Sequence, residues 1–77
     1  MHEFDICLRT FRQVQDFVEL ATVQPFEVWI GNEKQRVNGK SFMGVFSLNC
    51  RNMLRVSVKC NEEQFCKFQK EAAQLLA

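Results

Sequence analysis

Residues 36–48, RVNGKSFMGVFSL, decide how this chain folds, because they combine the end of a strand with the start of a helix. Asn38-Gly39 is a turn signal that breaks the extended segment before it. Ser41 follows shortly, and serine is a preferred N-cap because its hydroxyl accepts a hydrogen bond from the first helical turn. The stretch therefore predicts a short second helix with four apolar residues, Phe42, Met43, Val45 and Phe46.

A hairpin is predicted immediately before this stretch. Residues 26–30 alternate Phe, Val and Ile with Glu and Trp, which is the period of a half-buried strand. Gly31-Asn32 is a turn signal of the kind that closes a hairpin. The polar segment 33–37 would then pair back and lie at the edge of the sheet, where charged side chains discourage aggregation.

The N-terminal part of the chain predicts a strand followed by a long helix. Apolar residues alternate over residues 4–8, which indicates a first strand. Thr10 and Gln13 have the spacing of a capping box, and apolar residues at helical spacing follow over about 11–22. Pro25 prevents any continuation of that helix.

The C-terminal part predicts one more strand and one more helix. Residues 53–60 alternate apolar with polar side chains, so they indicate a fourth strand. Asn61 and Gln64 form a second capping pair, and an amphipathic last helix follows over about 62–76.

Together the elements have the order β-α-β-β-α-β-α. Two long amphipathic helices and four half-apolar strands predict an α+β fold, a four-stranded antiparallel sheet with the helices on one face. A chain of 77 residues has room for one core, so we expect a single domain over 1–77. Phe17, Val28, Val56 and Phe68 should share that core.

Composition excludes several classes of protein. Ten Lys and Arg balance nine Asp and Glu without forming a basic stripe, so we expect no nucleic-acid partner. No segment has the apolar length of a membrane span and the N-terminus lacks signal-peptide features, so we expect a cytoplasmic protein that binds no membrane. The four cysteines form no C-x-x-C pair, and we interpret them as small hydrophobic residues rather than a metal or redox site. We expect no metal and no cofactor.

Residues 36–48 closely resemble the signature around the regulatory serine of HPr, the histidine-containing phosphocarrier family of the bacterial sugar phosphotransferase system. That signature reads approximately V-N-x-K-S-I-M-G-V-M-S-L, and this chain shares its polar, glycine and aliphatic positions in order. Residues 12–21 also look like the first helix of the family. The resemblance implies the HPr-like open-faced β-sandwich over essentially the whole chain.

The resemblance fails at the phosphorylation site of the family. There the first helix opens with H-x-R-P, and the histidine takes phosphate from enzyme I. This chain has Thr10-Phe11-Arg12-Gln13 in that place, so Arg12 keeps the arginine while Thr10 and Gln13 replace the histidine and the proline. The only histidine, His2, stands at the start of the first predicted strand, and we interpret it as a surface residue.

Two arginines near the first predicted helix start are candidates for binding an anion. Arg9 and Arg12 add positive charge where a helix N-terminus already favours negative charge. The alternative is that Thr10 is only a helix cap and both arginines are solvated. Thr10 is a poor phosphate acceptor, because a hydroxyl nucleophile requires a base and the local segment holds no His, Asp or Glu.

Ser41 is the candidate for regulatory phosphorylation. In the family a dedicated kinase modifies this serine in some bacteria, and the product is a corepressor of catabolic genes. A catabolite-repression variant of HPr also lacks the histidine and keeps the serine. The alternative is that Ser41 is only an N-cap. Phe42, Met43 and Phe46 either form an exposed docking patch or complete a small core. Phe11 follows the cap at a position that the resemblance implies is exposed, so it is also a candidate for partner binding.

The leading hypothesis is a regulatory or protein-binding HPr-like protein without histidine phosphotransfer. By resemblance, its partners would be phosphotransferase-system components, HPr kinase or a transcription regulator. The alternative is a working phosphocarrier that uses a different acceptor residue. We expect no enzyme, because the sequence shows no Ser-His-Asp, Cys-His or paired-carboxylate constellation.

Overall fold

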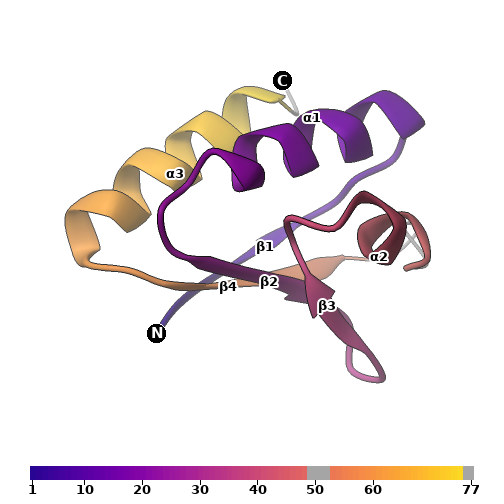
Figure 1. Ribbon diagram of the computed structural model, residues 1–77, viewed down its shortest axis with the longest axis horizontal. Helices are drawn as coiled ribbons and strands as arrows, with labels where there is room; N and C mark the ends of the chain where they lie inside the picture. Colours follow the sequence, from indigo (N-terminus) through magenta and orange to yellow (C-terminus); the bar gives the residue numbers. More distant parts are fainter. Residues whose placement is uncertain (49–52, 76–77) are drawn as a thin grey trace.

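A computed structural model describes residues 1–48 and 53–75, and these contain the elements in the predicted order (Figure 1). The sequence-based boundaries of the first helix are confirmed at both ends. The elements are β1 (His2–Ile6), α1 (Phe11–Thr22), β2 (Glu27–Gly31), β3 (Arg36–Asn38), α2 (Phe42–Phe46), β4 (Leu54–Lys59) and α3 (Glu62–Leu75).

The four strands form one antiparallel sheet in the order β1-β4-β2-β3. Val56 in the central strand β4 stands opposite Phe4 of β1 on one side and opposite Ile30 of β2 on the other. β3 lies at the edge of the sheet, as the polar composition of that segment predicted. Helices α1 and α3 run across the same face of the sheet, and the other face is open (Figure 1).

Both long helices begin at the predicted capping pairs. Thr10 Oγ1 accepts the Gln13 N–H at 3.1 Å, and Gln13 Oε1 accepts the Thr10 N–H at 3.3 Å. Asn61 Oδ1 accepts the Gln64 N–H at 2.7 Å, and Gln64 Oε1 accepts the Asn61 N–H at 3.2 Å. These bonds satisfy backbone donors that would otherwise lack partners, so local sequence determines where each helix starts.

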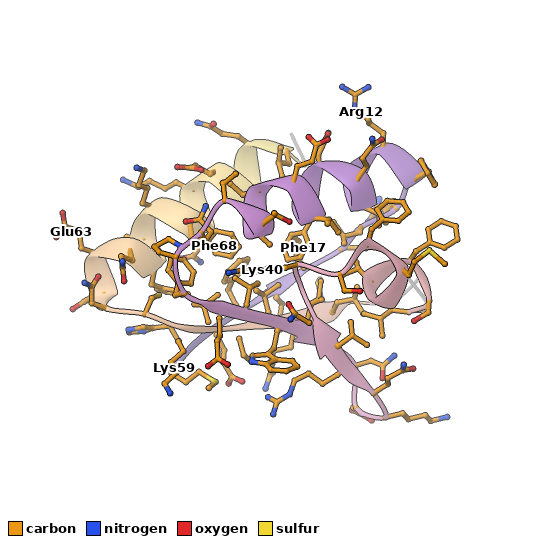
Figure 2. All side chains as sticks on the ribbon, viewed as in Figure 1. Arg12, Phe17, Lys40, Lys59, Glu63 and Phe68 are labelled. Carbon is orange, nitrogen blue, oxygen red and sulfur yellow. The ribbon has the colours of Figure 1, made fainter. Side chains whose placement is uncertain are left out.

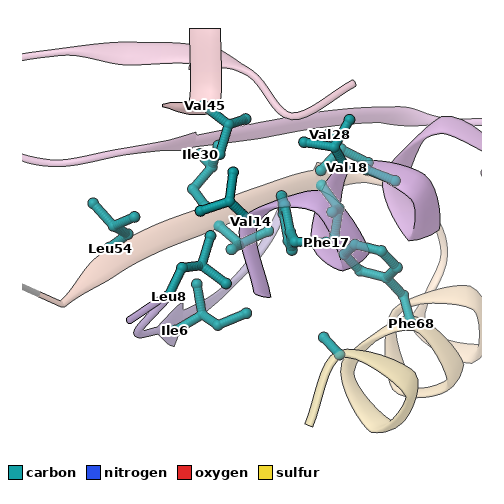
Figure 3. Packing of buried hydrophobic residues seen from close by; sticks show 14 of the residues in the cluster. Ile6, Leu8, Val14, Phe17, Val18, Val28, Ile30, Val45, Leu54 and Phe68 are labelled. Carbon is teal, nitrogen blue, oxygen red and sulfur yellow. The ribbon is translucent and has the colours of Figure 1, made fainter. Parts of the chain in front are cut away.

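The core lies between the sheet and the two long helices (Figure 3). Phe17 and Phe68 are fully buried, with ring centroids 6.3 Å apart. Val28 and Val56 belong to the same buried cluster, which confirms the predicted shared core. Phe68 also meets Phe26 edge-on at 5.8 Å, so it joins α3 both to α1 and to the residue that precedes β2.

The connection between β2 and β3 differs from the prediction. It spans residues 32–35, rather than turning at Gly31-Asn32, and β3 begins only at Arg36. Asn32 organises this loop: its N–H donates to the Gln35 carbonyl at 2.9 Å, and its Oδ1 accepts the N–H groups of Lys34 and Gln35, both at 2.9 Å. The asparagine side chain thus replaces a tighter backbone turn.

The predicted bounds of the first strand and of the last helix can also be compared with the structure. The first strand covers His2–Ile6 rather than residues 4–8, because its ladder with β4 ends at the pair Ile6 and Leu54. The last helix begins where its capping pair predicted and continues to Leu75; the final residue of the predicted range, Leu76, lies outside the described residues.

Gly31 gives β3 room to approach β2. A Cβ at Gly31 would lie 2.7 Å from Arg36 Cα and 3.0 Å from the Gln35 carbonyl carbon, so the backbone would have to move. We expect Gly31→Ala to lower the free energy of unfolding by about 1–3 kcal/mol in urea denaturation. Gly44→Ala is the control, because its nearest contact would be Ser41 Oγ at 3.3 Å. An equal loss in both variants would contradict the prediction.

Candidate functional site

The starts of α1 and α2 are joined by three phenylalanine rings. The Phe11 ring meets Phe42 at 5.6 Å and Phe46 at 5.5 Å, both edge-on, and Phe42 stacks on Phe46 at 5.8 Å. Residues that are three and four apart share one side of a helix, so Phe46 is a neighbour of both Phe42 and Met43 on α2. We call the set of Phe11, Phe42, Met43 and Phe46 the aromatic patch.

The structure shows how far each of these residues is exposed. Val45 is the fully buried residue of α2, and Phe42 packs partly against the core. Phe11, Met43 and Phe46 keep 58%, 73% and 50% of their surface exposed. A helix this short has one side to bury, so its other apolar residues face solvent. An exposed cluster of large apolar side chains is typical of a protein-binding surface.

At the start of α1 three backbone donors, the N–H groups of Arg9, Thr10 and Gln13, are occupied by the protein itself. Gln13 Oε1 accepts the Arg9 N–H at 2.7 Å in addition to the Thr10 N–H. Thr10 Oγ1 in turn accepts the Gln13 N–H, which closes the capping box. A bound anion would compete with these contacts for the same N–H groups. The capping role predicted for Thr10 is therefore confirmed.

The two arginine side chains lie on the outside of the molecule. Arg12 Nε lies 3.2 Å from Asp16 Oδ1, one turn further along α1, and the Arg12 side chain is 82% exposed. Figure 2 shows Arg12 pointing away from the core. Arg9 is also exposed. Asp16 therefore offsets part of the positive charge that the sequence placed near the helix start.

Ser41 caps α2, as predicted, and remains exposed. Its Oγ accepts the Gly44 N–H at 3.3 Å, and its own N–H donates to the Asn38 carbonyl at 3.0 Å. The next residue in the chain is Phe42 of the aromatic patch. The structure thus places the hydroxyl of Ser41 in solvent at the border of that patch.

Lys40 is a residue that sequence reasoning used only as part of a signature. Its Nζ donates to the Gln24 carbonyl at 2.9 Å, in a partly buried contact. Gln24 follows α1, and its side chain donates to the Leu20 carbonyl at 3.0 Å. Lys40 therefore ties the segment before Ser41 to the end of α1. No local sequence pattern predicts this contact, because its two residues are far apart in the sequence.

The single histidine is far from the start of α1 along the sheet. His2 lies on β1 and stacks on Phe65 of α3, with ring centroids 4.7 Å apart and an interplanar angle of 19°. It is half-buried: the first turn of α3 covers one side of its ring, and the residue keeps part of its surface exposed, in agreement with its interpretation as a surface residue. In Figure 1 the N-terminus and the start of α1 stand at opposite ends of the molecule.

The three cysteines in the described part of the chain are free thiols, and they do not form a cluster. Cys7 and Cys60 are half-buried, and burial raises the pKa of the Cys60 thiol, partly offset by the N-terminal ammonium group. Cys66 is exposed, so it does not act as a core residue, and Cys50 lies outside the described residues. Residues 1–48 and 53–75 place no three His, Cys, Asp or Glu side chains where they would hold a metal ion. In the same residues, no helix has the length and apolarity to cross a membrane.

Comparison with known proteins gives one family and a consistent set of structures. The family model PTS-HPr, described as the PTS HPr component phosphorylation site, matches residues 10–77. The structure of HPr-C-His from Thermoanaerobacter tengcongensis has a TM-score of 0.72 and 26% identity, over 99% of this chain and 86% of that chain. A phosphocarrier protein HPr from Bacillus anthracis str. Ames also has a TM-score of 0.72, with 17% identity over 96% and 94% of the two chains.

A third similar structure is the catabolite repression containing protein Crh of Bacillus subtilis. Its TM-score is 0.65, with 23% identity over 87% of this chain and 77% of that chain. The comparison with curated proteins finds no match. The solved structures share the α+β fold described above, which confirms the predicted fold class.

Proposed function

The chain belongs to the HPr family of the bacterial sugar phosphotransferase system, and we propose that it is a regulatory or protein-binding member without histidine phosphotransfer. The main support for this proposal is the position of the single histidine. His2 stacks on Phe65 at the start of β1, whereas α1 begins with Thr10 in a closed capping box. A phosphate acceptor must be free to attack, and neither residue stands free at the start of α1.

Thr10 is poorly suited to replace the histidine as acceptor. Attack by a hydroxyl requires a general base within hydrogen-bond reach. The Thr10 hydroxyl instead accepts the Gln13 N–H, and the nearby carboxylate, Asp16, is bound to Arg12. These contacts disfavour the alternative of a working phosphocarrier with a different acceptor residue.

Incubation with enzyme I and phosphoenolpyruvate tests this part of the proposal. We expect the intact mass of the protein to stay unchanged, while an HPr that carries the histidine gains one phosphate in the same mixture. Thr10→Ala is the matched variant. A phosphate gained by the wild-type chain and lost in Thr10→Ala would establish Thr10 as the acceptor and overturn the proposal.

We propose that the aromatic patch binds the protein partner. Three of its members are half-exposed or more, and Arg9 and Arg12 stand beside Phe11 in the chain. Exposed aromatic and methionine side chains beside arginines have the composition of a protein interface. Proteins of the HPr family interact with other proteins of the phosphotransferase system. A component of that system, HPr kinase or a transcription regulator is therefore the proposed partner, and we propose no enzymatic activity for the chain itself.

We further propose Ser41 as the site of regulatory phosphorylation. The hydroxyl is exposed, and its weak capping bond of 3.3 Å leaves it accessible to a kinase. A phosphate adds close to two negative charges at neutral pH. On Ser41 these charges would stand next to Phe42, so modification would change which partners the aromatic patch accepts.

Incubation with an HPr kinase and ATP tests the role of Ser41. We expect wild-type protein to gain one phosphate and Ser41→Ala to gain none. Ser47→Ala is the matched control, because Ser47 lies at the other end of α2 and its Oγ donates to the Gly44 carbonyl at 2.6 Å. Unmodified wild-type protein, or phosphate retained in Ser41→Ala, would show that Ser41 is only a cap.

A further inference from the structure

The open face of the sheet holds two arginines on either side of a glycine. Gly31 of β2 stands opposite Arg36 of β3 and opposite Arg55 of β4 in the register. Alternate residues of a strand share a face, so Arg55 lies on the same face as Lys59, which Figure 2 shows pointing away from α1 and α3. Gly31 places no side chain between the two arginines, and the backbone of residues 35 and 36 lies close to it.

Gly31 and both arginines line a hollow of about 320 Å³. Gly31 and Ser57 lie along it, and the loop 32–35 borders it. Its volume falls at the lower end of the range typical of small-molecule sites. We call it the Gly31 pocket; the residues that carry the argument are Glu3, Lys34, Arg36, Arg55 and Ser57.

The positive groups of the pocket are incompletely paired. Arg55 Nε lies 3.4 Å from Asp5 Oδ1, which is a long contact and engages one of its nitrogens. No ion pair forms at Lys34 or Arg36 in the part of the chain that the structure describes. Arg36 and Arg55 stand on either side of Gly31, so an anion between them can accept charge-assisted hydrogen bonds from both guanidinium groups.

Another part of the pocket lining, Glu3 and Ser57, is polar. Ser57 is 1% exposed although it lies on the open face of the sheet, and its Oγ donates to Glu3 Oε2 at 2.8 Å. The buried hydroxyl holds the Glu3 carboxylate in place, and a carboxylate has further capacity to accept hydrogen bonds. Glu3 would repel a bare anion, but it can accept hydrogen bonds from the hydroxyl groups of a ligand.

We propose that the Gly31 pocket binds a small phosphorylated polyol. The phosphate lies between the guanidinium groups of Arg36 and Arg55, because guanidinium donors match phosphate oxygens in geometry and charge. Hydroxyl groups of the same ligand donate to Glu3. The pocket is on the face opposite the core, whereas α2 of the aromatic patch buries Val45 in the core. The proposal for the Gly31 pocket is therefore independent of the proposal for the aromatic patch, and a failed test of one does not contradict the other.

Fluorescence of Trp29 provides the test. Trp29 is the single tryptophan of a chain without tyrosine, and it lies two residues from Gly31 on the same face. We expect glycerol 3-phosphate to change this fluorescence in a saturable way, and Arg36→Gln to weaken its binding by about tenfold. Lys59→Gln is the matched control, because it removes the same charge from the same face, and its affinity should stay within about twofold of wild type.

Inorganic phosphate and glycerol separate the two parts of the recognition. Glycerol should give no response, and inorganic phosphate should bind more weakly than glycerol 3-phosphate, because it lacks the hydroxyl groups that Glu3 accepts. Circular dichroism confirms that Arg36→Gln, a change on an exposed edge strand, leaves the fold intact. The proposal is overturned by an absent response of wild-type protein, by unchanged affinity in folded Arg36→Gln, or by equal affinity for inorganic phosphate.

Discussion

Replacing Phe68 with alanine should lower the free energy of unfolding by about 3–5 kcal/mol. The side chain is 1% exposed, and its ring meets Phe4 at 5.9 Å, Phe26 at 5.8 Å and Phe17 at 6.3 Å. Its removal leaves a cavity where α3, α1 and the sheet meet. A domain is stable by only about 5–15 kcal/mol, so a loss of this size removes much of the stability of a small chain. Urea denaturation monitored by circular dichroism measures it.

Phe65→Ala is the control for this experiment. It removes the same side chain one turn earlier in α3, but Phe65 is half-buried and its ring stacks on His2 near the surface. The free energy of unfolding should therefore fall clearly less in Phe65→Ala than in Phe68→Ala, because less apolar surface returns to water and no enclosed cavity forms. A loss in Phe65→Ala as large as that in Phe68→Ala would show that the packing around Phe68 does not dominate the core.

The double variant Met43→Ala and Phe46→Ala should weaken binding to HPr kinase by about thirtyfold or more. Both side chains are at least half exposed, so their loss leaves the fold intact while it removes two apolar anchors of the aromatic patch. Titration calorimetry with the kinase, in the absence of ATP, measures the affinity. Circular dichroism verifies that the variant is folded.

Met53→Ala is the control for the docking prediction. Met53 is 61% exposed, similar to Met43, but it precedes β4 and lines a hollow with Asp5 on the open face of the sheet. Its removal should leave the affinity for the kinase within about twofold of wild type. If Met53→Ala weakens binding as much as the double variant, the aromatic patch is not the docking surface.

Interactions confined to a few neighbouring residues were predictable from the sequence. Thr10 with Gln13 and Asn61 with Gln64 set the starts of α1 and α3, because capping bonds span three residues. The start of α2 at Ser41 followed from the same kind of contact. The loop after β2 was placed wrongly, since Gly31 reads as a turn residue but serves the close approach of β3.

For the candidate functional site, the sequence identified residue types, and the tertiary structure decided which of them meet. The contact of Phe11 with Phe42 and Phe46 depends on how α1 packs against α2. The contact of Lys40 with Gln24 depends on the same packing. No local sequence pattern predicts these contacts, because the residues that meet are far apart in the sequence.

The sequence by itself determined the order of the elements, the helix starts, the shared core of Phe17, Val28, Val56 and Phe68, and the absence of any histidine other than His2. These follow from hydrophobic periodicity and from bonds between near neighbours. Only the tertiary structure decided that part of the aromatic patch is exposed and that Arg36 and Arg55 flank Gly31. Strand register and helix packing bring distant residues together, and both are set by the burial of the whole core rather than by any single segment.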